Sequence, residues 1–155
     1  MTRIHVPIAL RWSDLDAYGH VNNARMLTLL EEARIEVFWR GRGASATPLP
    51  ELHIDEGAQS LIARQEVEYL AQIPHHRQPI IVDMWIGRMG GASLDVCYEV
   101  LSPDASQVYA RAQTTVVMLD ASKGTPRRLT EAERTAWEPY LEAPVAFRRG
   151  SPGTA

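Results

Sequence analysis

Residues 14–23 read Asp-Leu-Asp-Ala-Tyr-Gly-His-Val-Asn-Asn, and the sequence pattern changes on either side of them. Before them, residues 3–12 alternate between apolar and polar side chains, which predicts a half-buried strand. Pro7 cannot donate a backbone hydrogen bond, so it favours a strand at the edge of a sheet. After them, apolar residues recur every three or four positions, which predicts an amphipathic helix capped by Asn22 or Asn23. The quoted stretch is therefore a loop that joins a strand to a helix.

The rest of the chain predicts four more strands. The first helix should end near Arg40, and residues 44–57 should form a long connection. Alternating apolar residues predict strands over residues 59–69, 79–89, 93–101 and 108–119. Antiparallel hairpins are indicated by two turn signals, Gly90-Gly91 and Ser102-Pro103-Asp104. Thr130 and Glu133 form a capping box, which predicts a short second helix through about Tyr140.

This order of elements predicts an α+β fold with a single domain over residues 1–142. One face of a five-stranded antiparallel sheet must cover the long helix, because the chain offers no other layer. Residues 123–128 indicate a turn. Residues 143–155 are polar and contain glycine and proline, so we expect them to form a disordered tail. A sheet of this size leaves strand edges uncovered, which favours oligomerisation.

The composition argues against several classes of protein. The chain has 155 residues and a net charge of −3, which does not favour nucleic-acid binding. Cys97 is the single cysteine, so an internal disulfide cannot form. No apolar run approaches the roughly 20 residues that a membrane span needs, and the N-terminal residues do not resemble a signal peptide. We therefore expect a cytoplasmic domain without a membrane partner.

The loop carries two carboxylates, Asp14 and Asp16, close to the predicted start of the helix. One interpretation is structural, because carboxylates near a helix N-terminus stabilise it by about 0.3–1 kcal/mol. Asp16 lies too far before the cap for that role, and Gly19 would let a ligand approach the backbone closely. Free N–H groups at a helix N-terminus can also bind a developing oxyanion. The sequence therefore allows an acyl-transfer site, with a carboxylate opposite an oxyanion hole.

Other residues that could carry chemistry give weaker signals. Glu31 and Glu32 lie in the middle of the predicted helix, where pairing of Glu31 with Arg34 on a solvated face is the simpler interpretation. His75 and His76 are adjacent, and neighbouring residues rarely converge on one metal ion, so we predict no metal site. The sequence contains neither a nucleotide-binding glycine loop nor the nucleophile elbow of serine hydrolases.

Two segments of the sequence resemble the signature of hotdog-fold thioesterases. They are RWSDLDAYGHVNNARML at residues 11–27 and EEAR at residues 31–34. The resemblance is to the 4-hydroxybenzoyl-CoA thioesterase-like and acyl-ACP thioesterase-like branches. Residues 63–70 also resemble the family's second strand, and residues 88–94 resemble the hairpin between its third and fourth strands.

The resemblance implies a hotdog fold, in which a curved antiparallel sheet wraps a long helix. Such domains pair edge to edge into homodimers, which often pair into homotetramers, and their active sites lie at the dimer interface. Asp16 would be the catalytic nucleophile or general base, while the backbone N–H of Asn23 would polarise the thioester carbonyl. His20 would orient water, substrate or Asp16. The implied substrate-binding residues are Tyr18, Gly19, Val21, Asn22, Arg88 and Ser93.

The implied substrate is an acyl-CoA or an acyl-carrier protein, with coenzyme A as part of the substrate and no other cofactor. Basic residues that could meet the CoA phosphates are Arg88, Arg127 and Arg128. Glu31 or Glu32 is a reserve catalytic candidate, because some hotdog thioesterases place a glutamate on the helix. The competing hypothesis is a hotdog domain that binds acyl-CoA or an acyl-carrier protein without turnover. A hotdog dehydratase is disfavoured, because the Asp-x-Asn-Pro-x-His pattern is absent.

Overall fold

The structure, a computed structural model, describes residues 2–38 and 58–148. These residues form an α+β fold, as predicted, with one antiparallel sheet. The strands are β1 (Ile4–Ile8), β2 (Ala58–Tyr69), β3 (Ile80–Met89), β4 (Ser93–Leu101), β5 (Val108–Asp120) and β6 (Thr125–Pro126). The helices are α1 (Asn23–Phe38) and α2 (Glu131–Trp137).

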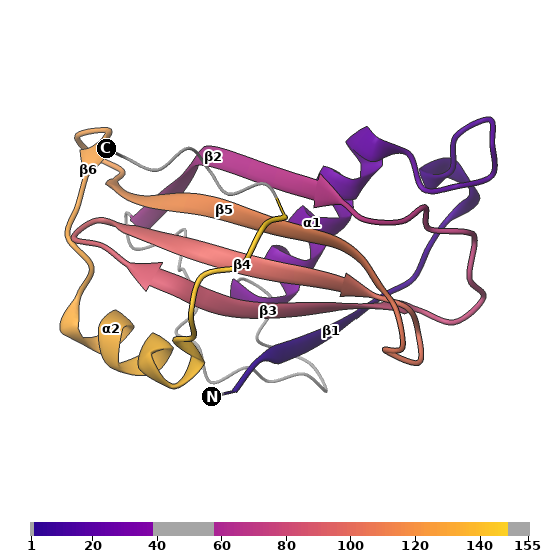
Figure 1. The fold of residues 1–155 in the computed structure, drawn as a ribbon. Coiled ribbons are helices and arrows are strands. Elements are labelled where there is room, and N and C mark those ends of the chain that lie inside the picture. The colour runs from indigo at the N-terminus through magenta and orange to yellow at the C-terminus, as the bar shows by residue number, and fades with distance from the viewer. Residues whose placement is uncertain (1, 39–57, 149–155) are drawn as a thin grey trace.

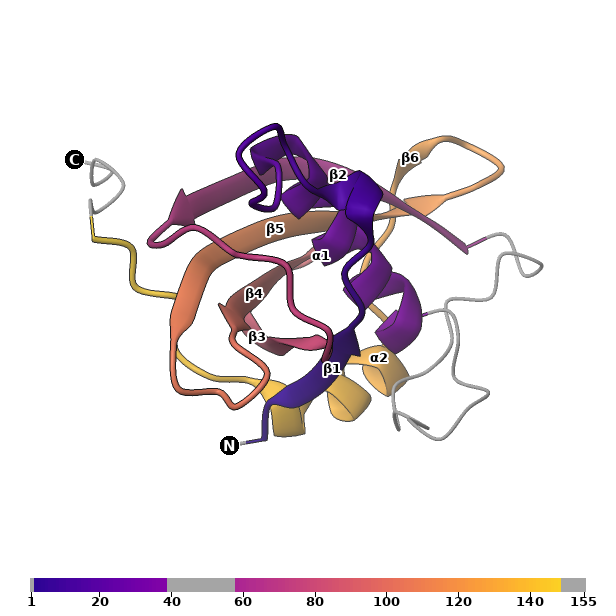
Figure 2. The same cartoon turned by 90° about the vertical axis from the view of Figure 1, so that its right-hand side faces the viewer.

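The strands follow the order β1-β3-β4-β5-β2, and the sheet curves around α1 (Figures 1 and 2). β1, which contains Pro7, is an edge strand as predicted, and β2 forms the opposite edge. The short strand β6 pairs with the end of β5, where the sequence had indicated only a turn. The sheet therefore has six strands rather than the predicted five.

The main core lies between α1 and the inner face of the sheet. α1 buries Met26, Leu30 and Val37 against alternate residues of the central strands, which are Ile80, Val82, Met84, Leu94, Val96, Tyr98 and Val100. The helix begins where predicted, because the side-chain Oδ1 of Asn22 accepts the N–H of Ala24 at 2.8 Å. The predicted helix end near Arg40 and the predicted connection over residues 44–57 lie outside the described residues.

Three local predictions are wrong. The first strand ends at Ile8, and Trp12 lies in a short 3-10 turn with its side chain 78% exposed instead of facing the core. Alternation had placed Leu61 on the same face as Val67, but the register of β2 shifts after Ile62, so Ile62 faces the core with Val67 while Leu61 is exposed. Arg34 does not pair with Glu31, because it is buried in the core.

Residues 143–148 lie across the outer face of the sheet, where we had expected a disordered tail. Val145 is buried with Trp85 and Cys97, and Phe147 packs against them. We call these four residues the outer cluster. The Trp85 indole donates to the carbonyl of Ala143 at 2.9 Å. Residues 149–155 of the predicted tail lie outside the described residues.

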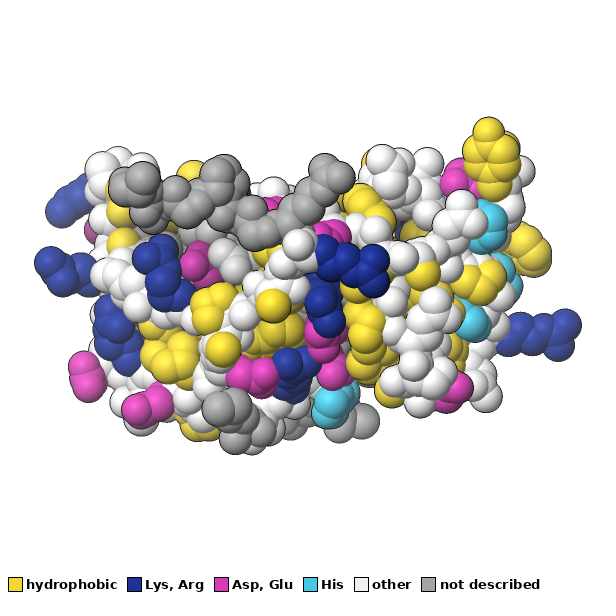
Figure 3. Space-filling view, viewed as in Figure 1, with side chains coloured by type: hydrophobic (Ala, Val, Ile, Leu, Met, Phe, Trp, Pro, Cys, Tyr) yellow, Lys and Arg dark blue, Asp and Glu magenta, His cyan; other side chains and the backbone are white. Residues whose placement is uncertain are grey.

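Ion pairs surround the outer cluster on the same face. The Arg3 guanidinium lies 3.9 Å from the centre of the Trp85 ring and donates to the carboxylates of Glu99 and Glu142. Arg111 donates to Glu99 at 3.1 Å and to the carbonyl of Ala146. Basic and acidic side chains therefore alternate with apolar ones on this face (Figure 3). These contacts hold Glu142 and Ala146 against the outer face of the sheet.

Candidate active site

The loop between β1 and α1 is held in shape by its own backbone. The Asp16 N–H donates to the carbonyl of His20 at 2.8 Å, and Leu15 forms an antiparallel bridge with Val21. Gly19 has a φ of +77°, a conformation that other residues adopt only with strain. The Val21 N–H donates to the carbonyl of Ile73 at 2.9 Å, which ties this loop to the segment after β2.

Asp14 has a structural role in this loop. Its side chain is fully buried and accepts hydrogen bonds from the Arg11 N–H at 2.8 Å and from the Arg11 guanidinium at 3.0 Å. Burial alone would raise the pKa of Asp14, but the Arg11 donors outweigh it and hold this pKa below its ordinary value. Its backbone carbonyl also accepts the Asn22 N–H at 2.8 Å, so Asp14 fixes both ends of the loop.

Asp16 is held differently, because only one of its carboxylate oxygens is occupied. Oδ1 accepts the backbone N–H groups of Tyr18 at 2.8 Å and His20 at 3.3 Å. Oδ2 accepts no hydrogen bond from the described residues. Two backbone donors therefore fix the orientation of the carboxylate and leave its second oxygen available for chemistry.

The first turn of α1 presents free donors beside this carboxylate. The side-chain Oδ1 of Asn22 accepts the Ala24 N–H, and its backbone carbonyl accepts the Met26 N–H. The N–H groups of Asn23 and Arg25 have no acceptor among the described residues. Both groups carry the positive end of the helix dipole, so this turn favours an anion or a developing oxyanion.

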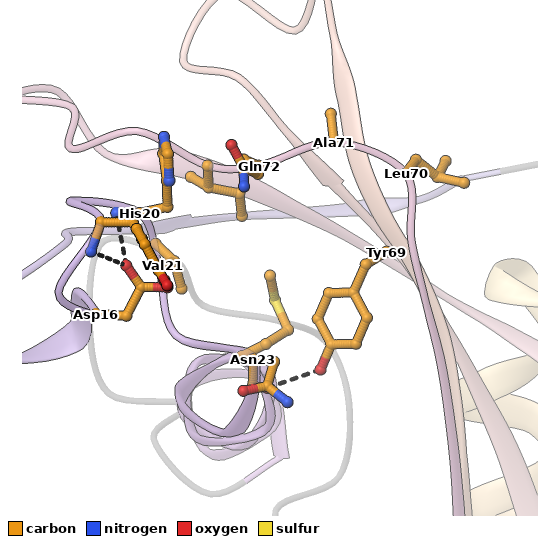
Figure 4. A pocket seen from close by; sticks show the side chains of 11 residues that line it. Asp16, His20, Val21, Asn23, Tyr69, Leu70, Ala71 and Gln72 are labelled. Atoms are coloured by element: carbon orange, nitrogen blue, oxygen red, sulfur yellow. Dashed lines mark hydrogen bonds between the residues drawn. The ribbon is translucent and has the colours of Figure 1, made fainter.

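A pocket of about 540 Å³ brings the carboxylate and the helix start together (Figure 4). It is lined by Asp16, Tyr18, His20, Val21, Asn23, Met26, Tyr69, Leu70, Ala71, Gln72 and Ile73. The His20 Nδ1 atom is buried without a hydrogen-bond partner among the described residues. A buried polar atom of this kind normally has a partner, so Nδ1 is an unsatisfied hydrogen-bonding group in a residue that lines the pocket. Histidine side chains gather at this end of the molecule (Figure 3).

Five of the predicted site residues line the pocket, and the others lie elsewhere. Asp16, Tyr18, His20, Val21 and Asn23 do so, whereas Gly19 and Asn22 shape the loop and the helix start. Arg88 and Ser93 lie in the β3–β4 hairpin, at the opposite end of the sheet (Figure 1).

The reserve carboxylates and the predicted phosphate ligands also lie outside the pocket of the same chain. Glu31 and Glu32 are exposed on α1, and neither lines the pocket. Arg88 pairs with Asp95 at 3.0 Å, and Arg127 pairs with Glu133 at 2.7 Å. The remaining candidate, Arg128, is exposed.

Tyr69 is a pocket residue that the sequence reasoning missed. It is the last residue of β2, and its hydroxyl donates to the backbone carbonyl of Asn23 at 2.7 Å (Figure 4). Burial in this environment raises the pKa of the Tyr69 phenol. The sequence did contain a signal. Tyr69 ends the apolar alternation of residues 59–69, so its ring could have been placed on the inner face of the sheet.

The described residues offer neither a metal centre nor a membrane span. They contain no group of three or more histidine, cysteine, aspartate or glutamate residues arranged to hold a metal ion. They also contain no helix whose length and hydropathy would suit a membrane crossing.

The family model described as the thioesterase-like superfamily matches residues 10–145. The chain belongs to this superfamily. The matched region includes the Asp16 loop, α1, and strands β2 to β6, so the whole pocket falls within it. No curated protein matches the sequence.

Solved thioesterase structures share the fold. A predicted thioesterase from Bacillus stearothermophilus is 24% identical, with a TM-score of 0.77, and the match covers 93% of this chain and all of that one. A thioesterase from Thermus thermophilus, solved in complex with coenzyme A and zinc, is 29% identical with a TM-score of 0.67, covering 88% and 92% of the two chains. A 1,4-dihydroxy-2-naphthoyl-CoA thioesterase from Synechocystis is 20% identical with a TM-score of 0.72, covering 87% and 95%.

Proposed function

We propose that this protein hydrolyses an acyl-CoA thioester to a free acid and coenzyme A, with Asp16 as general base. The observation that carries this proposal is the Asp16 carboxylate, whose Oδ1 is fixed by backbone donors while Oδ2 is open. A protein that only binds acyl-CoA would gain nothing from an oriented carboxylate beside the helix start. The solved complex of a similar thioesterase with coenzyme A supports the choice of thiol.

In the proposed reaction, water binds between Asp16 and His20. Oδ2 of Asp16 accepts a proton from this water while the water oxygen attacks the thioester carbonyl carbon. His20 lines the same pocket and orients this water. The C–S bond then breaks, and the proton on Asp16 passes to the departing thiolate. The products are the acid and the thiol, and Asp16 returns to its ionised form.

The start of α1 supplies the second part of the reaction. As water attacks, negative charge develops on the carbonyl oxygen of the thioester. Asn23 lines the same pocket, and its free N–H is held by the helix, so this N–H stabilises that charge without reorganisation. Removal of one such donor typically lowers kcat about 10²–10³-fold in other enzymes.

We further propose a homodimer in which the β2 strands of two chains pair. β2 spans 12 residues, and its outer edge has no strand partner among the described residues. An exposed edge of this length is a template for strand pairing. A two-fold axis normal to the sheet would pair the strands antiparallel and bring the β6 end of one subunit to the pocket of the other.

This arrangement would give the distant basic residues a role in binding the CoA phosphates. Arg128 follows β6, and Arg88 precedes the β3–β4 turn, so both lie at the end of the sheet that the dimer would bring to the partner's pocket. Arg128 is exposed, while Arg88 already pairs with Asp95. Ser93 lies in the same hairpin as Arg88 and would reach the pantetheine arm from there.

The test is a free-thiol release assay over a panel of aliphatic and aromatic acyl-CoA substrates. Asp16→Asn should lower kcat about 10²–10⁴-fold on every substrate that the wild type cleaves. The matched control is Asp104→Asn, since Asp104 also accepts a backbone N–H, that of Ser106 at 3.1 Å, but lies outside the pocket. A single turnover in ¹⁸O-labelled water should place the label directly in the acid.

Two results would overturn this proposal. Wild-type turnover by Asp16→Asn would remove Asp16 from the reaction. Tight binding of acyl-CoA without any thiol release would support a non-catalytic binding domain instead. Release from an acyl-carrier protein but from no acyl-CoA would keep the reaction and change the substrate class.

A further inference from the structure

The hydrogen bond between Tyr69 and Asn23 joins the edge strand to the first turn of α1. The Tyr69 hydroxyl donates to the Asn23 carbonyl at 2.7 Å, across 46 positions of sequence. Among the described residues, no other hydrogen bond connects a strand to residues 23–26. Both residues line the pocket, and Tyr69 is 48% exposed in the single chain.

We propose that Tyr69 is a positioning residue, which rests on the function proposed above. The Asn23 N–H stabilises the thioester oxyanion only if the first turn holds a fixed distance and angle to Asp16. Of residues 23–26 only Met26 is buried, so core packing holds this turn from one side alone. The Tyr69 hydroxyl fixes the turn from the side of the sheet.

The backbone next to Tyr69 is also held in place by hydrogen bonds. The N–H groups of Leu70 and Ala71 both donate to the carbonyl of Tyr109, at 2.8 and 3.1 Å. This double contact fixes the chain where β2 ends and leaves the Tyr69 ring little freedom to move away from α1. The position of the helix start is thereby set by β2, the strand whose outer edge is open for pairing.

The tether also has a consequence for the phenol group. Because its proton is donated to the Asn23 carbonyl, the hydroxyl cannot donate that proton to a substrate. Tyr69 touches the reacting centre only through the helix start, so its removal should disturb the transition state more than the binding of substrate.

The experiment compares Tyr69→Phe with Tyr109→Phe. Tyr109 is the matched control, because its hydroxyl also makes one hydrogen bond, to His76 at 2.8 Å, and it does not line the pocket. Tyr69→Phe should lower kcat about tenfold with KM changed less than twofold, as expected for the loss of one positioning hydrogen bond. Tyr109→Phe should leave both constants within twofold of wild type.

Hydrogen exchange supplies a readout that does not depend on activity. Peptides covering residues 23–27 should exchange several-fold faster in Tyr69→Phe than in wild type or Tyr109→Phe. An unchanged exchange rate would overturn the tether, and an unchanged kcat in an active enzyme would overturn the positioning role. A raised KM at constant kcat would assign Tyr69 to substrate binding and likewise overturn it. If the wild-type protein is inactive on all thioesters, the proposed function is refuted. The tether is then still tested separately, by the comparison of hydrogen-exchange rates.

Discussion

Gly87 lies against the thiol of Cys97, so closely that a Cβ atom at residue 87 would come within 2.6 Å of the Cys97 Sγ. The same Cβ would lie 3.2 Å from the Cα of Pro144, in the segment that covers the outer face. The pairing of β3 with β4 changes register between Ile86 and Arg88, which places Gly87 in a bulge. The absence of a side chain at residue 87 therefore lets the C-terminal segment pack onto the sheet.

Gly87→Ala should destabilise the protein by about 1–3 kcal/mol, because the added methyl group overpacks the contact with Cys97 and Pro144. Urea unfolding followed by circular dichroism measures this change. Gly91→Ala is the control, since a Cβ there would meet no atom within 4 Å. Equal stability of Gly87→Ala and Gly91→Ala would show that the segment does not pack as described.

The Cys97 thiol should react slowly with Ellman's reagent in the native protein. Cys97 is fully buried, and burial raises its pKa to about 11, so only about one thiol in a thousand is ionised at pH 8. A chain ending at Glu142 lacks Val145 and Phe147, which cover this thiol, and should react at least tenfold faster. Rapid labelling of the folded full-length protein would contradict the buried position of Cys97.

Asp14 should contribute stability that depends on pH. The pKa of Asp14 lies below its unfolded value, so ionised Asp14 stabilises the fold at pH above about 3.8, and this contribution is lost as the pH falls through the lower folded value. Asp14→Asn should therefore lower the free energy of unfolding by about 1.5–3 kcal/mol at pH 7. The difference from wild type should shrink at pH 2.5, as measured by urea unfolding at both pH values. A difference that stays constant with pH would mean that the Arg11 contacts do not depend on the carboxylate charge.

Replacement of Arg34 by methionine should be tolerated. Arg34 is only 3% exposed, and its guanidinium donates to the hydroxyls of Tyr98 and Thr114 at 3.2 and 3.4 Å, with no carboxylate partner among the described residues. A buried cation without a counterion is unfavourable, whereas methionine keeps the apolar stem. Arg34→Met should unfold at the wild-type urea concentration or above, while Arg34→Ala should lose about 2 kcal/mol or more through the cavity. A large loss in Arg34→Met would show that the charge itself stabilises the core.

Alternation and turn chemistry were enough to predict most of the sheet. β4 spans the predicted residues, and alternate residues of β3 and β4 face the core, as their apolar alternation indicates. The capping box at Thr130 and Glu133 also forms, with the Glu133 N–H donating to Thr130 Oγ1 at 3.1 Å. These features depend on neighbours in sequence, which is why the sequence alone was sufficient.

The errors all involve contacts between distant segments. The charge of Arg34 favoured a solvated face of α1, and its partners on β4 and β5 could not be read from a helix pattern. The bulge after Ile62 reverses which residue of β2 faces inward, and no local residue signals it. Val145 and Phe147 form a two-residue alternation, too short to predict that this segment packs on a sheet.

The loop around Asp16 was found from its residue types, while its geometry required the structure. At the level of sequence, only the family resemblance favoured Asp16 over Asp14. The structure distinguishes the two carboxylates by their hydrogen bonds. Arg11 donates to both oxygens of Asp14, whereas backbone N–H groups donate to one oxygen of Asp16 and leave the other open. The contribution of Tyr69 could not be predicted, because its hydrogen bond crosses from β2 to the helix start.

The contacts of Arg3 have a consequence for how the chain is made. Arg3 binds Glu142, 139 positions later, so this contact can form only after residue 142 has been synthesised. Until then, the Trp85 and Cys97 side chains on the growing sheet remain uncovered by Val145 and Phe147. A chain that stops before residue 143 would therefore expose an apolar patch on the outer face of its sheet, which is a target for chaperones.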